Sequence, residues 1–337
     1  MNLLSIENLK AGYKLKNYTV EAVNNVSLEV QENEFLGIVG ESGCGKSTLA
    51  LAVIRLLPFP GEIFSGRIRF KGQDIITLSE NDLRKIRWKE ISIVFQSSMN
   101  CLNPVKKIKD QMSDVMIYHD NHNGAQSVER ISKALELVNV SPKYLEAYPH
   151  QLSGGMKQRV VIAMALLLKP SLIIMDEPTT ALDVVVQRKI LQDLEDLRKE
   201  LGFAVIFITH DFSLLIEISD TIAVMYAGTI VEKAPSYTIF SRPLHPYTYG
   251  LINSFPPLTG ERKRREGIPG NPPDLSTKIE GCPFFERCSK HIEGVCEESE
   301  PPNMEIENNH TVKCHLYNEG KFINGKNSKW KGNSKKH

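Results

Sequence analysis

Three short segments of this 337-residue chain place glycine, hydroxyl, lysine and acidic residues at spacings that suit phosphate chemistry. In the first, GIVGESGCGKST, the residues Gly40, Gly45, Lys46 and Ser47 fit the phosphate-binding pattern G-x-x-x-x-G-K-S. The glycines let backbone N–H groups turn toward phosphate oxygens, the lysine reaches the β- and γ-phosphates, and the serine hydroxyl binds Mg²⁺. Because an apolar run precedes the loop and helix-forming residues follow it, the segment predicts a nucleotide site rather than a plain glycine-rich turn.

The second segment, SLIIMDEP, supplies two carboxylates at the end of an apolar run. Asp176 is expected in the Mg²⁺ shell, where nucleotide-binding loops of this kind need an acid from a neighbouring strand. Glu177, the next residue, is expected to polarise an attacking water as general base. Alone, the pair would indicate surface acids, but beside the glycine-rich loop it indicates phosphoryl chemistry.

The third segment is LSGGMKQR, in which Ser153, Gly154 and Gly155 precede a predicted helix. A capping hydroxyl and bare backbone N–H groups at a helix start form a second anion-binding place. Since the first loop already holds the phosphates, we expect the second one to serve the nucleotide of another subunit.

These segments need a scaffold, and the residues around them predict strands and helices in alternation. Alternating runs over residues 1–40 predict three strands, SGRIRFKGQDI predicts a hairpin at 65–75, and ISIVFQ predicts a strand at 91–96. A helix is expected from 46 to 57. SLIIMDEP and FAVIFITH are unbroken apolar runs, which indicate a largely parallel sheet covered on both faces.

The predicted fold is an α/β nucleotide-binding core with a parallel sheet, an antiparallel β subdomain and a helical subdomain. The helical subdomain is expected at about 97–165, where polar residues recur with helical period. Proline-rich segments near 241–273 indicate a boundary. We therefore predict a nucleotide-binding domain at 1–240 and a small C-terminal extension at 241–319.

The composition and the hydrophobic pattern argue against a nucleic-acid-binding, a membrane-spanning and an exported protein. The net charge is +1, which does not favour a nucleic-acid partner. The longest apolar run, at 160–168, is far shorter than the roughly 20 residues that a membrane span needs. The N-terminus lacks a signal-peptide pattern, so a cytoplasmic location is expected. The last eighteen residues, 320–337, carry six lysines and no acid, which is typical of a solvated, disordered tail.

Together, the three segments resemble the ATP-binding subunits of ABC transporters over residues 1–240. GESGCGKST and LIIMDE resemble the Walker A and Walker B motifs of that family, and LSGGMKQR resembles its signature motif, with Met156 at a position where glutamine is commonest. The resemblance implies ATP and Mg²⁺ as cofactors. It implies nucleotide contacts from the Walker A residues Gly40, Glu41, Ser42, Gly43, Cys44, Gly45, Lys46, Ser47 and Thr48.

The resemblance implies roles for four further residues. Gln96 corresponds to the Q-loop glutamine, which contacts Mg²⁺ and the attacking water. His210 corresponds to the switch histidine at the γ-phosphate, and Asp183 to the D-loop aspartate that crosses the dimer interface. Tyr13 corresponds to the aromatic residue that stacks on adenine, although Tyr18 is close in sequence.

The mechanism that the resemblance implies is a sandwich of two subunits around two ATP molecules. Each ATP lies between the Walker A loop of one subunit and the signature loop of the other, and hydrolysis reopens the pair. The implied partners are a second ATPase subunit, with a paralogue favoured over an identical copy, and two membrane permease subunits. A solute-binding protein acts indirectly, and the chain is expected to lie peripherally on the cytoplasmic face of the membrane.

The C-terminal extension resembles one branch of the family, the ATPases of oligopeptide and dipeptide importers. The matching segments are RPLHPYTYGLINSFPPL, IPGNPPDL, GCPFFERC and VKCH. The resemblance implies import of di- or oligopeptides. A nickel or oligosaccharide importer of the same branch remains an alternative, as does a soluble ABC ATPase without a transport role.

Four of the six cysteines, Cys282, Cys288, Cys296 and Cys314, lie in this extension with spacing C-x5-C-x7-C-x17-C. Disulfides need an oxidising compartment, and structural zinc usually brings a close C-x₂₋₄-C pair, which is missing here. A [4Fe–4S] cluster needs four thiolates and is the favoured interpretation, since some members of the resembled branch carry one at this pattern. Zinc, with His315 as a spare ligand, and free thiols or disulfides stay open as alternatives.

Overall fold

The computed structural model describes residues 2–96, 98–120, 125–179, 182–254, 267–307 and 309–318. The basic tail predicted at 320–337 lies outside these residues. In the described part, no helix is both long and apolar enough to cross a membrane.

The central sheet contains eight strands, and both its parallel and its antiparallel parts position functional residues. The strand order is β11-β12-β10-β9-β3-β8-β7-β6. The strands are β3 (Phe35–Val39), β6 (Ile91–Val94), β7 (Leu172–Asp176), β8 (Ala204–Thr209), β9 (Thr221–Tyr226), β10 (Thr229–Pro235), β11 (Asn303–Glu307) and β12 (His310–Lys313). The pairs from β6 to β9 are parallel, as the apolar runs predict, whereas β9, β10, β12 and β11 pair antiparallel, so the sheet as a whole is mixed.

A second, antiparallel sheet forms the predicted β subdomain. Its order is β2-β1-β4-β5. Its strands are β1 (Asn2–Lys14), β2 (Thr19–Gln31), β4 (Gly61–Phe70) and β5 (Gln73–Asp74). The predicted hairpin at 65–75 is confirmed by the pairing of β4 with β5.

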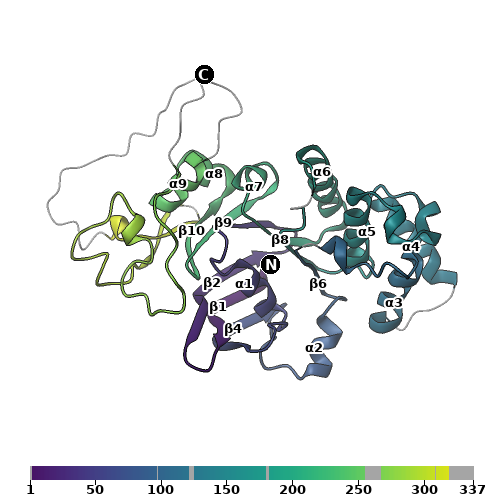
Figure 1. Cartoon of the computed structure of the whole chain (residues 1–337), viewed down its shortest axis with the longest axis horizontal. Helices are drawn as coiled ribbons and strands as arrows, with labels where there is room; N and C mark the ends of the chain where they lie inside the picture. Colours follow the sequence, from purple (N-terminus) through teal and green to yellow (C-terminus); the bar gives the residue numbers. More distant parts are fainter. Residues whose placement is uncertain are drawn as a thin grey trace, which may run out of the picture.

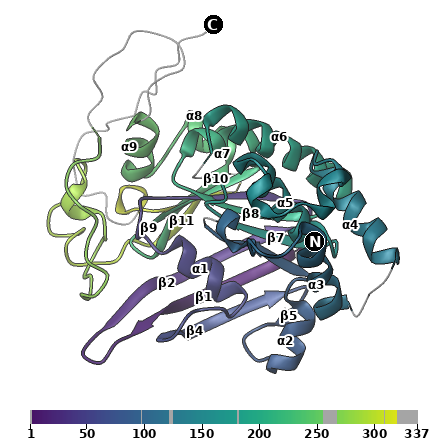
Figure 2. The same ribbon diagram turned by 45° about the vertical axis from the view of Figure 1, so that its right-hand side comes forward.

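Three of the described α-helices fall in or near the range of about 97–165 that was predicted for the helical subdomain, and the others lie elsewhere along the chain. The described α-helices are α1 (Lys46–Val53), α2 (Glu80–Ile86), α3 (Ile108–Asp120), α4 (Ala125–Leu137), α5 (Gly154–Leu166), α6 (Val184–Leu201), α7 (Phe212–Ile218), α8 (Ser236–Ser241) and α9 (Pro246–Ser254). In Figures 1 and 2, α3, α4 and α5 lie at one side of the molecule and the C-terminal extension lies at the other.

Helix α1 ends at Val53, four residues earlier than predicted. Arg55 adopts a left-handed backbone with φ 52°, which stops the helix, and its guanidinium donates to the carbonyls of Ile75 and Leu78. The prediction of a helix to residue 57 was wrong because these long-range hydrogen bonds leave no trace in the local sequence.

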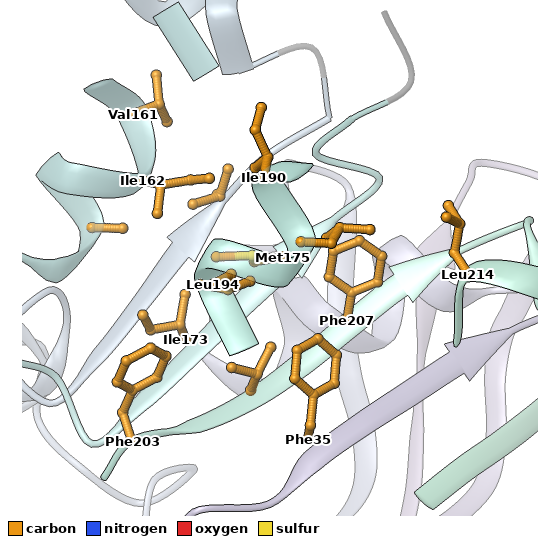
Figure 3. Close-up of a cluster of buried hydrophobic side chains, with 14 of the residues drawn as sticks. Phe35, Val161, Ile162, Ile173, Met175, Ile190, Leu194, Phe203, Phe207 and Leu214 are labelled. Carbon is orange, nitrogen blue, oxygen red and sulfur yellow. The ribbon is translucent and has the colours of Figure 1, made fainter. Parts of the chain in front are cut away.

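Alternation along β7 divides its side chains between two layers of the core. Ile173 and Met175 pack into the cluster beneath α5 and α6, together with Phe207 of β8, as Figure 3 shows. Leu172 and Ile174 pack into the other cluster, which includes α1 and the antiparallel sheet. Each such buried side chain contributes about 1.5–3 kcal/mol. Asp176 shares the parity of Leu172 and Ile174, so the strand directs its carboxylate toward the α1 side.

The C-terminal extension is continuous with the central sheet. β12 pairs with β10, and β11 pairs with β12, so two strands of the extension prolong the sheet of the nucleotide-binding core. The buried Glu232 of β10 accepts hydrogen bonds from the backbone N–H groups of Leu244 and His245, and its carboxylate lies 2.7 Å from His310 Nε2. This carboxylate therefore ties β10 to both α9 and β12.

Candidate nucleotide site

The predicted phosphate loop connects β3 to α1, which is the arrangement that the motif requires. Gly45 has φ 105°, and a Cβ there would lie 1.9 Å from the carbonyl oxygen of Ala22. A Cβ at Gly40 would lie 2.1 Å from the carbonyl oxygen of Met225. These two glycines are therefore required by close backbone contacts as well as by the phosphate that the loop is built to hold.

Lys46 is buried at the first position of α1. Its Nζ donates to the carbonyl oxygens of Gly40 at 2.8 Å and Glu41 at 2.9 Å. In this conformation the Lys46 ammonium group is hydrogen-bonded to the backbone of the loop, which folds around it. The exposed residues Ser42 and Ser47 and the buried Thr48 complete the segment.

The Asp176 carboxyl and the Ser47 hydroxyl, both expected at the Mg²⁺ ion, lie close enough for the hydroxyl to affect the carboxyl pKa. The Asp176 carboxyl is buried, and its Oδ1 has no hydrogen-bond partner in the structure. Burial raises the pKa of Asp176, while the Ser47 hydroxyl opposes that shift. An unpartnered buried carboxylate oxygen beside a serine hydroxyl fits Mg²⁺, which binds proteins through one or two carboxylates and substrate phosphates.

Gln96, Glu177 and His210 come together from three different strand ends. The Gln96 amide donates to Glu177 Oε2 at 3.0 Å, and His210 Nδ1 lies 3.3 Å from Glu177 Oε1. Glu177 is half-buried, whereas His210 is 62% exposed. Glu177, the predicted general base, therefore lies next to Gln96 and His210 at the carboxyl edge of the parallel strands.

The predicted signature loop lies against α6. The Ser153 hydroxyl caps α5 by accepting from the Met156 N–H, and a Cβ at Gly155 would lie 2.9 Å from Val186. Asp183 caps α6 by accepting from the N–H of Val186. These contacts place Ser153, Gly154 and Gly155 beside the start of α6.

Tyr13 lies at the end of β1, where it pairs with Val20 on one side and Gly61 on the other. Its ring approaches Gly61, so that a Cβ there would lie 3.1 Å from a ring carbon. Tyr18, the neighbouring aromatic residue, is half exposed. The stacking role of Tyr13 stays a prediction.

Two of the four cysteines of the extension accept a hydrogen bond at sulfur from a backbone N–H. The donors are Lys290 for Cys288, at 3.4 Å, and Ile292 for Cys296, at 3.2 Å. Burial, with a smaller contribution from the neighbouring thiols, raises the pKa of Cys282 to about 11 and that of Cys314 to about 12. All six cysteines are free, so no disulfide joins them.

Among the described residues, no group of three or more His, Cys, Asp and Glu side chains is arranged to hold a metal ion. Donor chemistry of four cysteine sulfurs, two of them with N–H···S hydrogen bonds, fits an iron–sulfur cluster, whose potential such bonds tune.

Two residues that the sequence did not predict reach the Walker A loop from the extension. The Glu41 N–H donates to the Tyr247 hydroxyl at 2.9 Å, and the Glu41 carboxylate pairs with Arg287. Both partners lie more than 200 positions away along the chain. A tyrosine in a helix and an arginine between two cysteines carry no sequence signal for this contact.

Comparison with known families finds two matches along the chain. Residues 23–180 match the model of the ABC transporter family, and residues 231–296 match the model of the oligopeptide/dipeptide transporter C-terminal region.

Relatives of known role match nearly the whole chain. A dipeptide transport ATP-binding protein of Caldanaerobacter subterraneus is 43% identical, covering 95% of this chain and 98% of its own length. An oligopeptide transport ATP-binding protein of Bacillus subtilis is 42% identical, covering 93% of this chain and 88% of its own length. A similar oligopeptide transport ATP-binding protein of Escherichia coli is 42% identical, covering 89% of both chains.

Among solved structures, a dimeric ATP-binding cassette in a post-hydrolysis state, bound to ADP and phosphate, superposes with a TM-score of 0.62. It is 29% identical and covers 69% of this chain and 98% of its own. A dimeric bacterial ABC transporter cassette superposes with a TM-score of 0.61 at 30% identity, covering 69% of this chain and 98% of its own.

Proposed function

This chain belongs to the ATP-binding subunits of ABC transporters, in the oligopeptide and dipeptide branch, and we propose that it hydrolyses ATP to power import of di- or oligopeptides through a membrane permease. One observation carries the proposal: the same chain matches the ABC transporter family and the oligopeptide/dipeptide transporter C-terminal region. The relatives that match almost end to end carry the same peptide-transport descriptions.

The geometry supports a division of work among the site residues. Glu177 is placed to accept a proton from water, because its carboxylate is half-buried and oriented by Gln96. His210 adjoins the same carboxylate and is exposed enough to reach a nucleotide. Lys46 and the loop amides hold the phosphates, and Ser47 with Asp176 would hold Mg²⁺. When bound, that ion neutralises charge on the phosphate oxygens.

The active form is proposed to be a pair of such subunits. Ser153, Gly154 and Gly155 lie at the start of α5 beside α6, and we propose that they contact the ATP held by a partner. The partner is a second ATP-binding subunit, for which we favour a paralogue. The pair would act on two permease subunits at the cytoplasmic face of the membrane, with a solute-binding protein delivering the peptide.

Reconstitution tests this function. The chain, its partner ATPase and the two permease subunits are placed in proteoliposomes with the solute-binding protein. Addition of peptide should raise ATP hydrolysis and drive peptide uptake, whereas nickel ions or oligosaccharides should do neither. Hydrolysis at the same rate without any permease would favour a soluble ATPase role. Uptake of nickel alone would assign the chain to a nickel importer of the same branch.

We further propose that Cys282, Cys288, Cys296 and Cys314 hold a [4Fe–4S] cluster. Support comes from four cysteine sulfurs in one small extension, two of which, those of Cys288 and Cys296, accept a hydrogen bond from a backbone N–H. Each thiolate of such a cluster binds its own iron, so the sulfurs lie farther apart than around one zinc. A bound cluster would cross-link the turn that carries Cys282 and Cys288 to the segments that carry Cys296 and Cys314.

Anaerobic purification tests the cluster. The wild-type protein should be brown and contain iron and inorganic sulfide, and Cys288→Ser should lose the colour. Cys101→Ser is the matched control, because Cys101 is exposed, lies outside the extension, and should not affect the iron content. A colourless protein loaded with zinc would contradict the assignment.

A further inference from the structure

The C-terminal extension grips one residue of the Walker A loop by both its side chain and its backbone. Arg287 donates from Nη1 to Glu41 Oε2 at 2.6 Å and from Nη2 to Glu41 Oε1 at 2.9 Å. The backbone N–H of Glu41 donates to the hydroxyl of Tyr247, in α9, at 2.9 Å. Glu41 therefore has no freedom to move without disturbing two elements of the extension.

Arg287 is itself held rigidly. Its side chain is only 5% exposed, its Nε donates to the Pro269 carbonyl at 2.8 Å, and its Nη1 also donates to the Tyr226 hydroxyl at 3.2 Å. The guanidinium lies near the rings of Tyr226 and Phe284, at 5.7 and 5.9 Å from their centroids. A bidentate, partly buried pair of this kind is strong, and removing the arginine leaves the Glu41 carboxylate without its counter-charge.

The rings around the guanidinium link it to α9. The ring centroids of Tyr226 and Tyr247 lie 4.6 Å apart. The ring centroid of Phe284 lies 5.2 Å from that of Tyr226 and 5.4 Å from that of Tyr247. Phe284 and Arg287 lie in the turn between Cys282 and Cys288, where the Arg287 N–H donates to the Phe284 carbonyl. The cysteine-bearing turn therefore packs directly against the residues that hold Glu41.

Glu41 also touches the phosphate-binding machinery. Its carbonyl accepts from Lys46 Nζ at 2.9 Å and from the N–H of Cys44 at 3.3 Å. Its carboxylate is a negative charge within a loop that must bind a polyanion. An unpaired carboxylate at this place would repel the phosphates, because charges separated by a few ångströms near a protein surface interact by several kcal/mol.

We propose that Arg287 is a positioning residue of the ATP site: it neutralises and fixes Glu41, so that the C-terminal extension sets the affinity of the Walker A loop for ATP. The inference rests on the ATP site of the proposed function. It depends on neither the peptide cargo nor the iron–sulfur cluster.

Equilibrium binding to the full-length chain tests the inference, with Mg²⁺ and a non-hydrolysable ATP analogue as the probe. Arg287→Met should weaken binding about five- to fifty-fold, the usual size of coupling between linked sites. Adding Glu41→Gln to Arg287→Met should recover most of that loss, because no unpaired carboxylate remains. At saturating ATP the turnover number of Arg287→Met should stay within about twofold of wild type, since Arg287 touches none of Gln96, Glu177 and His210 in the described contacts.

Arg242→Met is the matched control. Arg242 also pairs with a glutamate of the extension, Glu307, but both side chains are exposed and lie away from the loop. This variant should bind the analogue like wild type. Wild-type affinity in a folded Arg287→Met, or a double variant as weak as Arg287→Met alone, overturns the inference.

Hydrogen–deuterium exchange of residues 281–296 gives a second, independent measurement. Nucleotide should slow exchange there in wild type and in Arg242→Met, but not in Glu41→Gln, since coupling between two sites is reciprocal. If Arg287→Met fails to fold, the comparison of wild type with Glu41→Gln decides, and equal protection in both overturns the inference. A wild-type chain that binds no nucleotide would instead contradict the ATP site itself.

Discussion

Glu177 has an unusual backbone for a residue that ends a strand. Its φ is 44°, in the left-handed region, and its N–H donates to the Ile208 carbonyl at 2.9 Å. A non-glycine residue in this region costs on the order of 1 kcal/mol or more and persists only where its surroundings fix it. The turn directs the carboxylate toward Gln96 and His210, while Asp176 before it keeps the direction set by β7.

Glu177→Gln should bind ATP as well as wild type but hydrolyse it about 10²- to 10⁴-fold more slowly, the usual contribution of a general base. The amide keeps the shape and the contacts but cannot accept a proton. Nucleotide binding and phosphate release measure the two effects.

Glu217→Gln is the control for that substitution, because Glu217 forms an exposed ion pair with Arg188 on the surface of α7. It should leave hydrolysis unchanged. If Glu177→Gln hydrolyses ATP at a rate near that of wild type, Glu177 is not the general base.

At the scale of elements, the segment between β10 and α9 is held by buried polar groups rather than by apolar packing alone. His245 is fully buried, and its Nδ1 accepts from the Tyr247 N–H at 3.0 Å. This hydrogen bond places the tyrosine whose hydroxyl reaches Glu41. Burial lowers the pKa of His245 to about 3.

Stability should therefore fall in acid. In the unfolded chain His245 binds a proton below about pH 6.5, whereas in the folded chain it stays neutral down to about pH 3. The free energy of unfolding should decrease as pH falls from about 6.5 toward 3, by up to about 1.4 kcal/mol per pH unit from this group, and His245 should contribute no slope above that window.

Urea unfolding at pH 7.5, 6.5, 5.5 and 4.5 measures this effect in wild type and in His245→Asn. The variant should show a shallower acid slope, while His150→Asn, at an exposed histidine, should match wild type. Equal slopes in wild type and His245→Asn would show that the buried imidazole is not responsible.

At the scale of the whole molecule, the two anion-binding loops are separate. The Walker A loop lies where β3 meets α1, between the antiparallel sheet and the extension, while the signature loop caps α5 in the helical layer (Figures 1 and 2). In the proposed pair of subunits, a single chain would offer half of each composite site. The structural relatives are dimers, as a composite site requires.

Ser153→Arg should abolish ATP-dependent association while ATP still binds the Walker A loop of the same chain, because a long cation blocks the approach of the partner. Light scattering of the Glu177→Gln chain with ATP measures association, alone and with its partner ATPase. Loss of ATP binding in isolated Ser153→Arg would show that both loops serve one nucleotide within one chain.

The sequence by itself determined the nucleotide loop, the two acids and the strands that carry them, because these features depend on neighbours a few residues apart. The glycines at positions 40 and 45 predict a loop between a strand and a helix, and the apolar run before Asp176 predicts a second strand. Because successive side chains of a strand point to opposite faces, the position of each residue along the strand then fixes the face on which its side chain lies.

Only the tertiary structure decided how the extension joins the core. The pairing of β12 with β10, and the contacts of Tyr247 and Arg287 with Glu41, unite residues far apart along the chain. Such contacts depend on how whole elements pack, so no local pattern of charge or hydrophobicity encodes them. The four cysteines were visible in the sequence, but the turn between the first two became part of the nucleotide site only when the chain folded.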